Sequence, residues 1–310
     1  MWYTKRKSNG ESEMSAQKVV DLQGLNVKIC SPESPRAVVQ IAHGMEEHQD
    51  RYKVFVDYLL TKNLAVVTAD MRGHGAKMPK EDLGWFADRD GWKLLIEDQL
   101  KIREYIGKEF TGLPVYLVAH SMGSIISRVV LQKNSSLYDK VVLTGYPNYQ
   151  AAAGFGVLLA NICQTFTGSR GRSKLLNKLS TGVFNRSIES PETDFDWISY
   201  DRENITKFVE DPLCGFGFTV SAMRDLFTLV DYMHDTSRCE NVNSELPFLL
   251  LSGEDDPCAG GEAGRNDSIE TLKMSGFAQI SVKTYPKMRH EILNEAEKKI
   301  VFSDISDFFA

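Results

Sequence analysis

The chain alternates short apolar runs rich in β-branched residues with longer segments of helical periodicity. This alternation predicts parallel strands joined by helices, because a helix has to return the chain before the next parallel strand begins. Most of the apolar runs lack regular polar positions, as strands buried on both faces should. Six strands are predicted: Arg36–Ala42, Leu64–Ala69, Pro114–Ala119, Lys140–Gly145, Pro247–Ser252 and Gln279–Tyr285. The pattern indicates an α/β protein with a mostly parallel central sheet flanked by helices.

Helical periodicity fills most of the intervals between these strands. The predicted helices are Asp50–Thr61, Trp92–Glu109, Ser121–Gln132, about Gly260–Met274, and Glu291–Phe309. Before the first parallel strand, the segments Lys18–Gln23 and Leu25–Ser31 flank Gly24, which is typical of a β-hairpin. The hairpin should add antiparallel strands to one edge of the sheet.

About a hundred residues separate the strand that ends at Gly145 from the strand that begins at Pro247, far more than one ordinary connection needs. This segment opens with the apolar run Ala151–Cys163 and continues through a basic stretch around residues 170–178. We interpret it as a cap over the carboxyl edge of the sheet. The expected division is a core of residues 1–145 and 240–310, with residues 146–239 as the cap and its return to the core.

Charge and hydropathy exclude several classes of protein. With 36 Lys and Arg against 42 Asp and Glu, the net charge is −6, which gives no basic surface for a nucleic-acid backbone. No apolar run approaches the roughly 20 residues that span a bilayer, and the basic start Met1–Lys7 lacks the apolar region of a secretory signal. We therefore expect a cytoplasmic protein whose basic stretch could make transient contact with a membrane surface.

Five cysteines, Cys30, Cys163, Cys214, Cys239 and Cys258, are scattered along the chain without a CxxC pair. An odd number at irregular spacing argues against a disulfide framework and against a zinc cluster. We expect free thiols, and no metal or organic cofactor.

The predicted strand Pro114–Ala119 runs directly into His-Ser-Met-Gly-Ser and then into a helix. A serine at such a strand–turn–helix junction is typical of a nucleophile elbow, in which the tight turn exposes the hydroxyl oxygen above the sheet. Ser121 occupies that position. The usual motif is Gly-x-Ser-x-Gly, and Ala119 replaces the first glycine, which a tight turn tolerates because a methyl group is small.

A second loop, His43 to His48, follows the strand Arg36–Ala42. Acyl transfer builds negative charge on a carbonyl oxygen, and one of the stabilising N–H groups is expected at this position in the chain. The backbone N–H groups of Met45 and Met122 are the candidate pair. His43 should brace the loop through hydrogen bonds, and three other histidines are interpreted as structural or as lining the pocket: His48, His74 and His120.

An acid and a base should follow the serine in chain order, each after a later strand. The loop after Pro247–Ser252 contains Asp255 and Asp256, and spacing alone leaves both possible. His290 follows the last strand and is the only histidine beyond the acidic loop. It is the candidate general base, which would take the proton from Ser121 while a carboxylate fixes its tautomer.

Together these segments resemble the monoacylglycerol lipase and lysophospholipase branch of the α/β-hydrolases. The resemblance is carried by VVQIAHGMEEHQDRY, AVVTADMRGHG, AHSMGS and RHEILNE, and by FVEDPLCGFGFT, which is typical of bacterial members. One departure is Ala76, where the branch usually has serine after Gly-His-Gly. The resemblance implies an α/β-hydrolase fold with a helical cap, Ser121 as nucleophile, Asp256 rather than Asp255 as acid and His290 as base. It also implies Met45 and Met122 as oxyanion donors.

The expected activity is hydrolysis of carboxylic esters through an acyl-enzyme on Ser121. Candidate substrates are monoacylglycerol-like or lysophospholipid-like lipids and shorter acyl esters. The same residues could serve a thioesterase, an amidase, an acyltransferase or an enzyme that cleaves carbon–carbon bonds, because a fold and a triad do not define the bond attacked. A ligand-binding receptor without turnover is the alternative outside enzymes.

Overall fold

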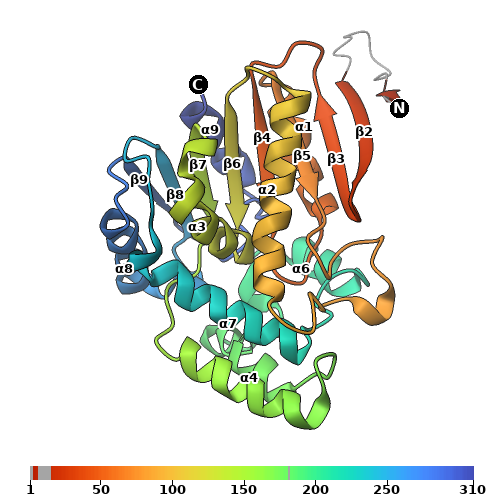
Figure 1. The fold of residues 1–310 in the computed structure, drawn as a ribbon, viewed down its shortest axis with the longest axis vertical. Coiled ribbons are helices and arrows are strands. Elements are labelled where there is room, and N and C mark those ends of the chain that lie inside the picture. Colours follow the sequence, from red (N-terminus) through yellow and green to blue (C-terminus); the bar gives the residue numbers. More distant parts are fainter. Residues whose placement is uncertain (1–2, 6–14, 181) are drawn as a thin grey trace.

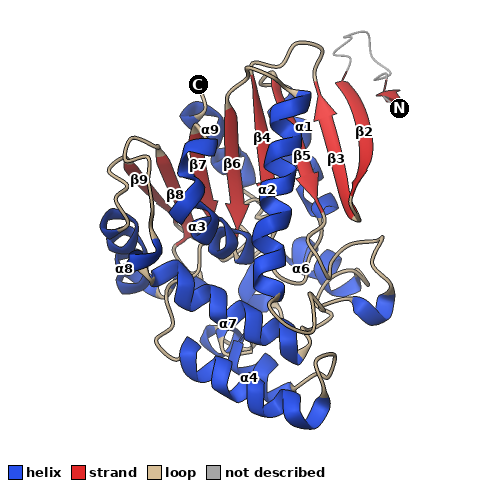
Figure 2. Cartoon of the chain, in the orientation of Figure 1, coloured by secondary structure: helices blue, strands red, loops and turns tan. Residues whose placement is uncertain are grey.

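The computed structural model describes residues 3–5, 15–180 and 182–310, and these residues form one nine-stranded sheet (Figures 1 and 2). The order across the sheet is β1-β2-β3-β5-β4-β6-β7-β8-β9. The strand bounds are β1 Tyr3–Lys5, β2 Ser15–Leu22, β3 Leu25–Ser31, β4 Ala37–Ala42, β5 Leu64–Ala69, β6 Val115–His120, β7 Lys140–Thr144, β8 Phe248–Gly253 and β9 Ile280–Tyr285.

Strands β5, β4, β6, β7, β8 and β9 pair in parallel, whereas β1, β2 and β3 add antiparallel pairs at one edge. The parallel strands all end at the same edge of the sheet, toward α7 and α4 in Figure 1. The loops after β4, β6, β8 and β9 therefore meet there, which is where open α/β sheets bind ligands.

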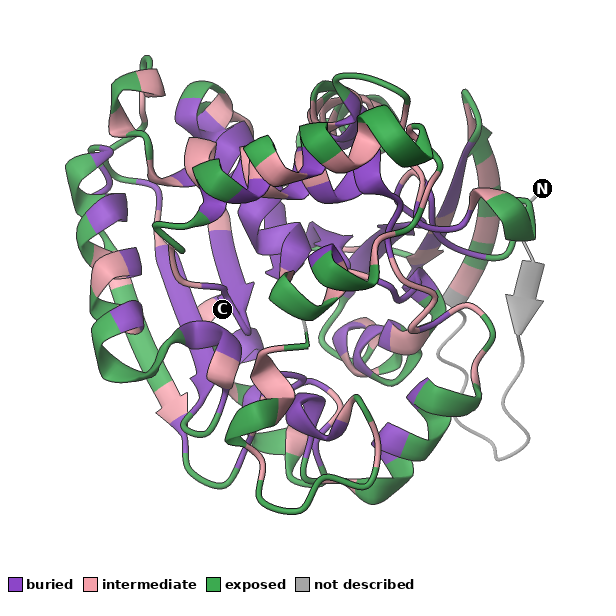
Figure 3. Cartoon of the chain, turned by 90° about the horizontal axis from the view of Figure 1, so that it is seen from below, coloured by how far each residue is buried: buried purple, intermediate pink, exposed green. Residues whose placement is uncertain are grey.

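Helices cover both faces of the sheet, and each face has its own apolar core. On one face lie α2 Gly91–Glu109, α3 Met122–Asn134 and α8 Gly261–Met274, which bury residues such as Ile102, Ile126 and Leu272. On the other lie α1 Lys53–Leu60 and α9 Lys298–Phe308, which bury Phe55 and Phe302. Figure 3 shows the central strands buried between helices whose outer faces are exposed. The chain is an α/β-hydrolase-type three-layer structure.

The predicted hairpin and all six predicted strands are present. The ends of the six strands lie within one residue of the expected ones, and those of the hairpin strands within three. The predicted helix 291–309 is wrong at its start, because α9 begins only at Lys298. The preceding residues are held in a turn: the backbone N–H of Glu291 donates to the Ile198 carbonyl at 2.7 Å, and the carboxylates of Glu291 and Glu295 are buried. The basic start, residues 1–7, falls mostly outside the described residues.

Between β7 and β8 the inserted segment forms four helices among its described residues: α4 Ala153–Thr167, α5 Lys174–Ser180, α6 Arg202–Glu210 and α7 Val220–His234. α4 packs along α7, below the carboxyl ends of the strands (Figure 1). The apolar run noted in the sequence lies mostly in α4, which buries Ala153 and Ala160 but exposes Phe155 and Phe166. The inserted segment thus covers the edge where the loops of the sheet converge.

Candidate active site

Ser121 lies at the turn between β6 and α3, in a backbone conformation that an L-residue rarely adopts, with φ +50° and ψ −119°. The turn is tight because α3 begins against the end of β4: a Cβ on Gly123 would lie 2.3 Å from the Ala42 carbonyl oxygen. Ala119, the departure from the usual glycine, is fully buried in β6. These features hold the Ser121 hydroxyl above the sheet and leave no room for a larger residue at position 123.

His290 lies between Ser121 and Asp256. Its Nε2 is 2.8 Å from the Ser121 Oγ, and its Nδ1 is 3.1 and 3.0 Å from the two carboxylate oxygens of Asp256. Because a carboxylate only accepts, the Nδ1–H donates to Asp256 and leaves Nε2 free to accept from the Ser121 hydroxyl. The structure thus brings these three side chains into one hydrogen-bonded chain. Asp255 is elsewhere, where it accepts a bond from the Tyr200 hydroxyl at 3.0 Å.

Asp256 is fixed by the loop that carries it. Its Oδ1 accepts the backbone N–H of Cys258 at 2.9 Å, which caps a short 3-10 turn. The acid loop is pressed against the histidine loop, since a Cβ on Gly253 would lie 2.2 Å from the Met288 carbonyl oxygen. This cap directs the carboxylate of Asp256, rather than that of its neighbour, toward His290.

The pKa values of His290 and His120 are shifted in opposite directions, although the ring centroids are only 4.8 Å apart. Burial by itself lowers the pKa of His290, but the charge and hydrogen bonds of Asp256 outweigh burial and raise the pKa above its usual value. Burial lowers the pKa of His120 to about 4, and its Nδ1 lies 3.1 Å from the Thr144 carbonyl oxygen. His120 is therefore neutral at physiological pH and lines the pocket, as predicted.

The loop after β4 is braced by histidines. His43 Nε2 accepts the backbone N–H of Met71 at 2.8 Å, which confirms the bracing interpretation, and His74 Nε2 accepts the N–H of Glu46 at 3.2 Å. Met45 in this loop and Met122 at the start of α3 line the same cavity as Ser121. Met45 and Met122, whose backbone N–H groups were predicted from the sequence to be oxyanion donors, thus line the cavity that contains Ser121.

The cavity above Ser121 has a volume of about 520 Å³, within the range typical of small-molecule sites. Most of its wall comes from apolar residues of the inserted segment and of α3: Ile125, Phe155, Leu179, Val183, Phe184, Phe195, Trp197, Phe208, Leu226, Phe227 and Val230. Ser121 and His290 line the same cavity, and three glutamates are among its other polar residues. A ligand with an apolar chain and a polar group fits this lining.

The spacing of motifs did not reveal the contact between Trp197 and His290, whose ring centroids are 4.8 Å apart. Trp197 comes from the inserted segment. A second such contact is Glu295, whose carboxylate accepts bonds from Ser199 Oγ at 2.7 Å and from the backbone N–H of Arg289 at 2.8 Å. These contacts join the inserted segment to the histidine loop, so the segment fixes the position of His290.

A buried charge network centred on Arg51 also lies beside the site. Arg51 Nε donates to Glu47 at 3.2 Å, and Nη2 donates to Glu291 and, at 3.1 Å, to Asn204. Tyr52 Oη donates to Glu47 at 2.7 Å. Both Glu47 and Arg51 are in the quoted HGMEEHQDRY segment, so their presence was visible in the sequence, but their partners in α6 and after β9 were not.

Replacing Arg51 by methionine should lower the free energy of unfolding by about 3–5 kcal/mol, because it leaves two buried carboxylates without their cation. Lys53→Met is the matched control: Lys53 pairs with Asp57 on the exposed surface of α1, so its loss should change the free energy by under about 1 kcal/mol. Urea denaturation measures both. Equal losses for the two variants would contradict this account of the network.

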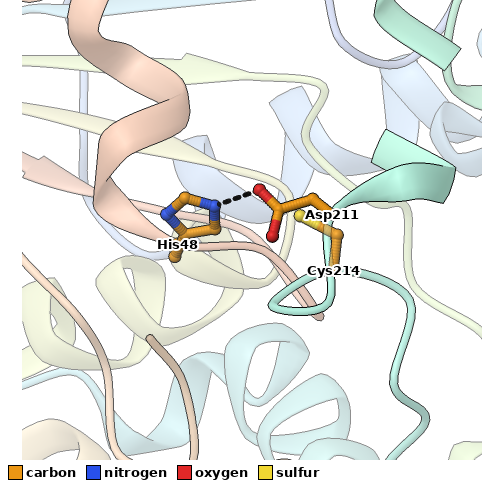
Figure 4. Close-up of side chains that lie close together, drawn as sticks. All are labelled: His48, Asp211 and Cys214. Carbon is orange, nitrogen blue, oxygen red and sulfur yellow. Dashed lines mark hydrogen bonds and ion pairs between the residues drawn. The ribbon is translucent and has the colours of Figure 1, made fainter. Parts of the chain in front are cut away.

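Ligand-type side chains gather in two places in the described ranges: Asp256 with Cys258 and His290, and His48 with Asp211 and Cys214. In the second group, shown in Figure 4, His48 Nε2 lies 2.9 Å from Asp211 Oδ2 in a direct hydrogen bond. Through this bond the loop after β4 is linked to the inserted segment.

The chain is similar in sequence and in fold to known proteins. The model of the family described as "Serine aminopeptidase, S33" matches residues 33–297. A monoacylglycerol lipase of Mycolicibacterium smegmatis is 26% identical over 282 residues, covering 88% of each chain. Human monoglyceride lipase is 25% identical over 275 residues, covering 84% of this chain and 81% of the relative. A thermostable carboxyl esterase of Bacillus coagulans has a similar fold, with a TM-score of 0.84, 23% identity and coverage of 100% and 97%.

Proposed function

The chain belongs to the serine aminopeptidase S33 family and is a carboxylic-ester hydrolase with an α/β-hydrolase fold, and on that premise we propose that it cleaves fatty-acyl glycerol esters through an acyl-enzyme on Ser121. The observation that carries the proposal is the 2.8 Å approach of His290 Nε2 to Ser121 Oγ within a largely apolar cavity. The names of the relatives, monoacylglycerol lipase and monoglyceride lipase, support the substrate class.

In the proposed mechanism, Ser121 Oγ attacks the ester carbonyl carbon while its proton passes to His290 Nε2. The backbone N–H groups of Met45 and Met122 donate to the developing oxyanion. The tetrahedral intermediate collapses, and the leaving alkoxide takes the proton from His290. Water then attacks the acyl-Ser121 carbonyl carbon and gives a proton to His290 Nε2. In the second collapse the fatty acid leaves, and His290 returns this proton to Ser121 Oγ. Asp256 holds the imidazole orientation throughout.

The segment 146–239 serves, in this proposal, as the cap of the acyl-binding site. Its helices contribute most of the apolar wall, while the core residues 1–145 and 240–310 contribute Ser121, Asp256 and His290. The boundaries predicted from the sequence would then separate the acyl-binding cap from the core that carries the catalytic side chains.

A panel of octanoyl derivatives tests the bond type. Octanoyl glycerol, an octanoyl thioester and an octanoyl anilide share one acyl group and differ only in the bond cleaved, so their kcat/KM values compare chemistry at constant acyl binding. The proposal expects the glycerol ester to be the best of the three. A higher kcat/KM for the thioester would favour a thioesterase, and a higher kcat/KM for the anilide would favour an amidase, in place of the proposed esterase.

A lipid surface is the proposed source of substrate. No helix among the described residues is long and apolar enough to cross a bilayer. However, α4 and α5 expose large apolar side chains: Phe166 is 85% exposed, and Phe155 and Leu179, which also line the cavity, are 64% and 47% exposed. In the basic stretch, Arg170 pairs with Asp82 and Arg172 donates to the Phe216 carbonyl. The exposed apolar side chains are thus available to a lipid aggregate.

Phe166→Asp should therefore lower the ratio of the rate on micellar 1-oleoylglycerol to the rate on monomeric p-nitrophenyl butyrate several-fold, because a charge on this surface opposes contact with lipid. Met274→Asp provides the control, since Met274 is 73% exposed on α8 in the core part of the chain. A ratio that falls equally in both variants, or in neither, would contradict the proposed surface.

A further inference from the structure

Glu46 occupies an unusual position next to Met45. Its side chain is buried, it lines the cavity above Ser121, and its φ of +55° lies in the left-handed region that favours glycine. A glutamate at such a position is strained, and strain of this kind gathers at functional sites. The residue therefore requires a reason other than local backbone preference.

The backbone of Glu46 is held on both sides. Its N–H donates to His74 Nε2 at 3.2 Å, and its carbonyl accepts the N–H of Gly215 at 3.0 Å. The link between His48 and Asp211 (Figure 4) ties the same two loops together. Glu46 thus has a fixed place between the proposed oxyanion loop and the inserted segment.

The charges of the cavity are unbalanced around this residue. The two other lining glutamates, Glu47 and Glu291, bond to Arg51. Within residues 3–5, 15–180 and 182–310, Glu46 has no ion pair within 4 Å, and no lysine or arginine lines the cavity. An anionic group bound here would meet a carboxyl group in a cavity whose lining contains no lysine or arginine.

Burial raises the pKa of Glu46 to about 7, while the N–H of Gly217 and the more distant Arg172 oppose the rise. Its own loop and the segments packed against it carry these titratable and charged groups: His43, Glu47, His48, His74, Arg172, Asp211 and Cys214. Burial lowers the pKa of His43, lowers that of His74 to about 3 and raises that of Cys214. Glu46 therefore changes from neutral to anionic as the pH rises through the physiological range.

We propose that Glu46 is a specificity-determining residue that makes the cavity select esters of uncharged alcohols over esters whose alcohol part carries phosphate. The proposal rests on the proposed ester hydrolysis at Ser121 and separates two substrate types that the sequence left open, the monoacylglycerol-like and the lysophospholipid-like. The negative charge of Glu46 would repel a phosphate close to the scissile bond, and repulsion in a partly dry site is strong. The selection should increase with pH, because the carboxyl group loses its proton.

The test compares two soluble substrates with the same acyl group, 1-octanoylglycerol and its 3-(methyl phosphate) diester. The diester carries one negative charge that does not change between pH 5 and 9. The ratio of their kcat/KM values removes the titration of His290, which both reactions require. The ratio is measured at pH 6 and pH 8 for the parent protein, for Glu46→Gln, and for Glu97→Gln, which removes a charge from the exposed face of α2.

In the parent protein the preference for the uncharged ester should grow severalfold from pH 6 to pH 8. Glu46→Gln should raise the relative kcat/KM of the phosphodiester by about tenfold at pH 8, mainly through its KM, and abolish the pH dependence of the ratio. Glu97→Gln should leave the ratio unchanged. A ratio in Glu46→Gln that still varies with pH as in the parent protein would overturn the proposal. Failure of the parent protein to cleave either ester would instead overturn the proposed function.

Discussion

Alanine in place of Ser121 is expected to lower kcat/KM for 1-octanoylglycerol by about 10⁴- to 10⁶-fold, because the substitution removes the hydroxyl group that accepts the acyl chain. The residual rate would come from binding and oxyanion stabilisation alone. The comparison uses purified proteins whose melting temperatures agree within a few degrees. Ser127→Ala is the matched control, since Ser127 is buried on the same helix and does not line the cavity.

The control should keep activity within about tenfold of the parent protein, because a buried hydroxyl away from the cavity affects packing and not chemistry. If Ser121→Ala hydrolysed the ester at a rate close to that of Ser127→Ala, Ser121 would not be the nucleophile.

Asparagine at position 256 is expected to lower kcat by about 10⁴-fold, because an amide cannot hold the Nδ1–H tautomer of His290 or stabilise the imidazolium. Asp255→Asn is the control within the same loop. Asp255 accepts a hydrogen bond from Tyr200 and not from His290, so Asp255→Asn should lower kcat only a few-fold. Comparable losses in the two variants would contradict the assigned geometry.

The pH profile of the Asp256 variant gives a second measure. Activity requires neutral His290, so the rate rises as the pH passes the pKa of this group. Asp256 raises that pKa, and removing its charge leaves burial, which lowers it. The acid limb of kcat/KM should thus move to lower pH in Asp256→Asn. A limb that moved to higher pH would show that another group sets the profile.

The sheet was predictable because its strands are short, buried and rich in β-branched residues, and these properties are local. β5 begins and ends at the residues expected from its sequence. The start of α9 was not predictable, because the turn before it depends on buried carboxylates that bond to residues about 90 positions earlier, such as Ser199. Periodicity does not record such long-range bonds.

The candidate site was predictable where it depends on local motifs and was not predictable where it depends on long-range contacts. Motif order identified Ser121 and His290, whose side chains the fold brings within 2.8 Å although 169 positions separate them. Spacing could not choose between adjacent aspartates; the cap that Asp256 makes with the Cys258 N–H accounts for the orientation seen. Arg51 and Trp197 act through partners far away in the chain, and no local pattern points to those partners.

Trapping the acyl-enzyme tests the central proposal most directly. The protein is mixed with an excess of p-nitrophenyl octanoate, quenched in acid within the first turnovers, digested and analysed by mass spectrometry. We predict one octanoyl adduct, on Ser121, which is absent in Ser121→Ala. The adduct should be more abundant with this activated ester than with an unactivated one. In a parallel experiment the protein is labelled with a fluorophosphonate. The proposal would be contradicted by an octanoyl adduct on another residue, or by rapid ester turnover in a protein whose Ser121 is not labelled.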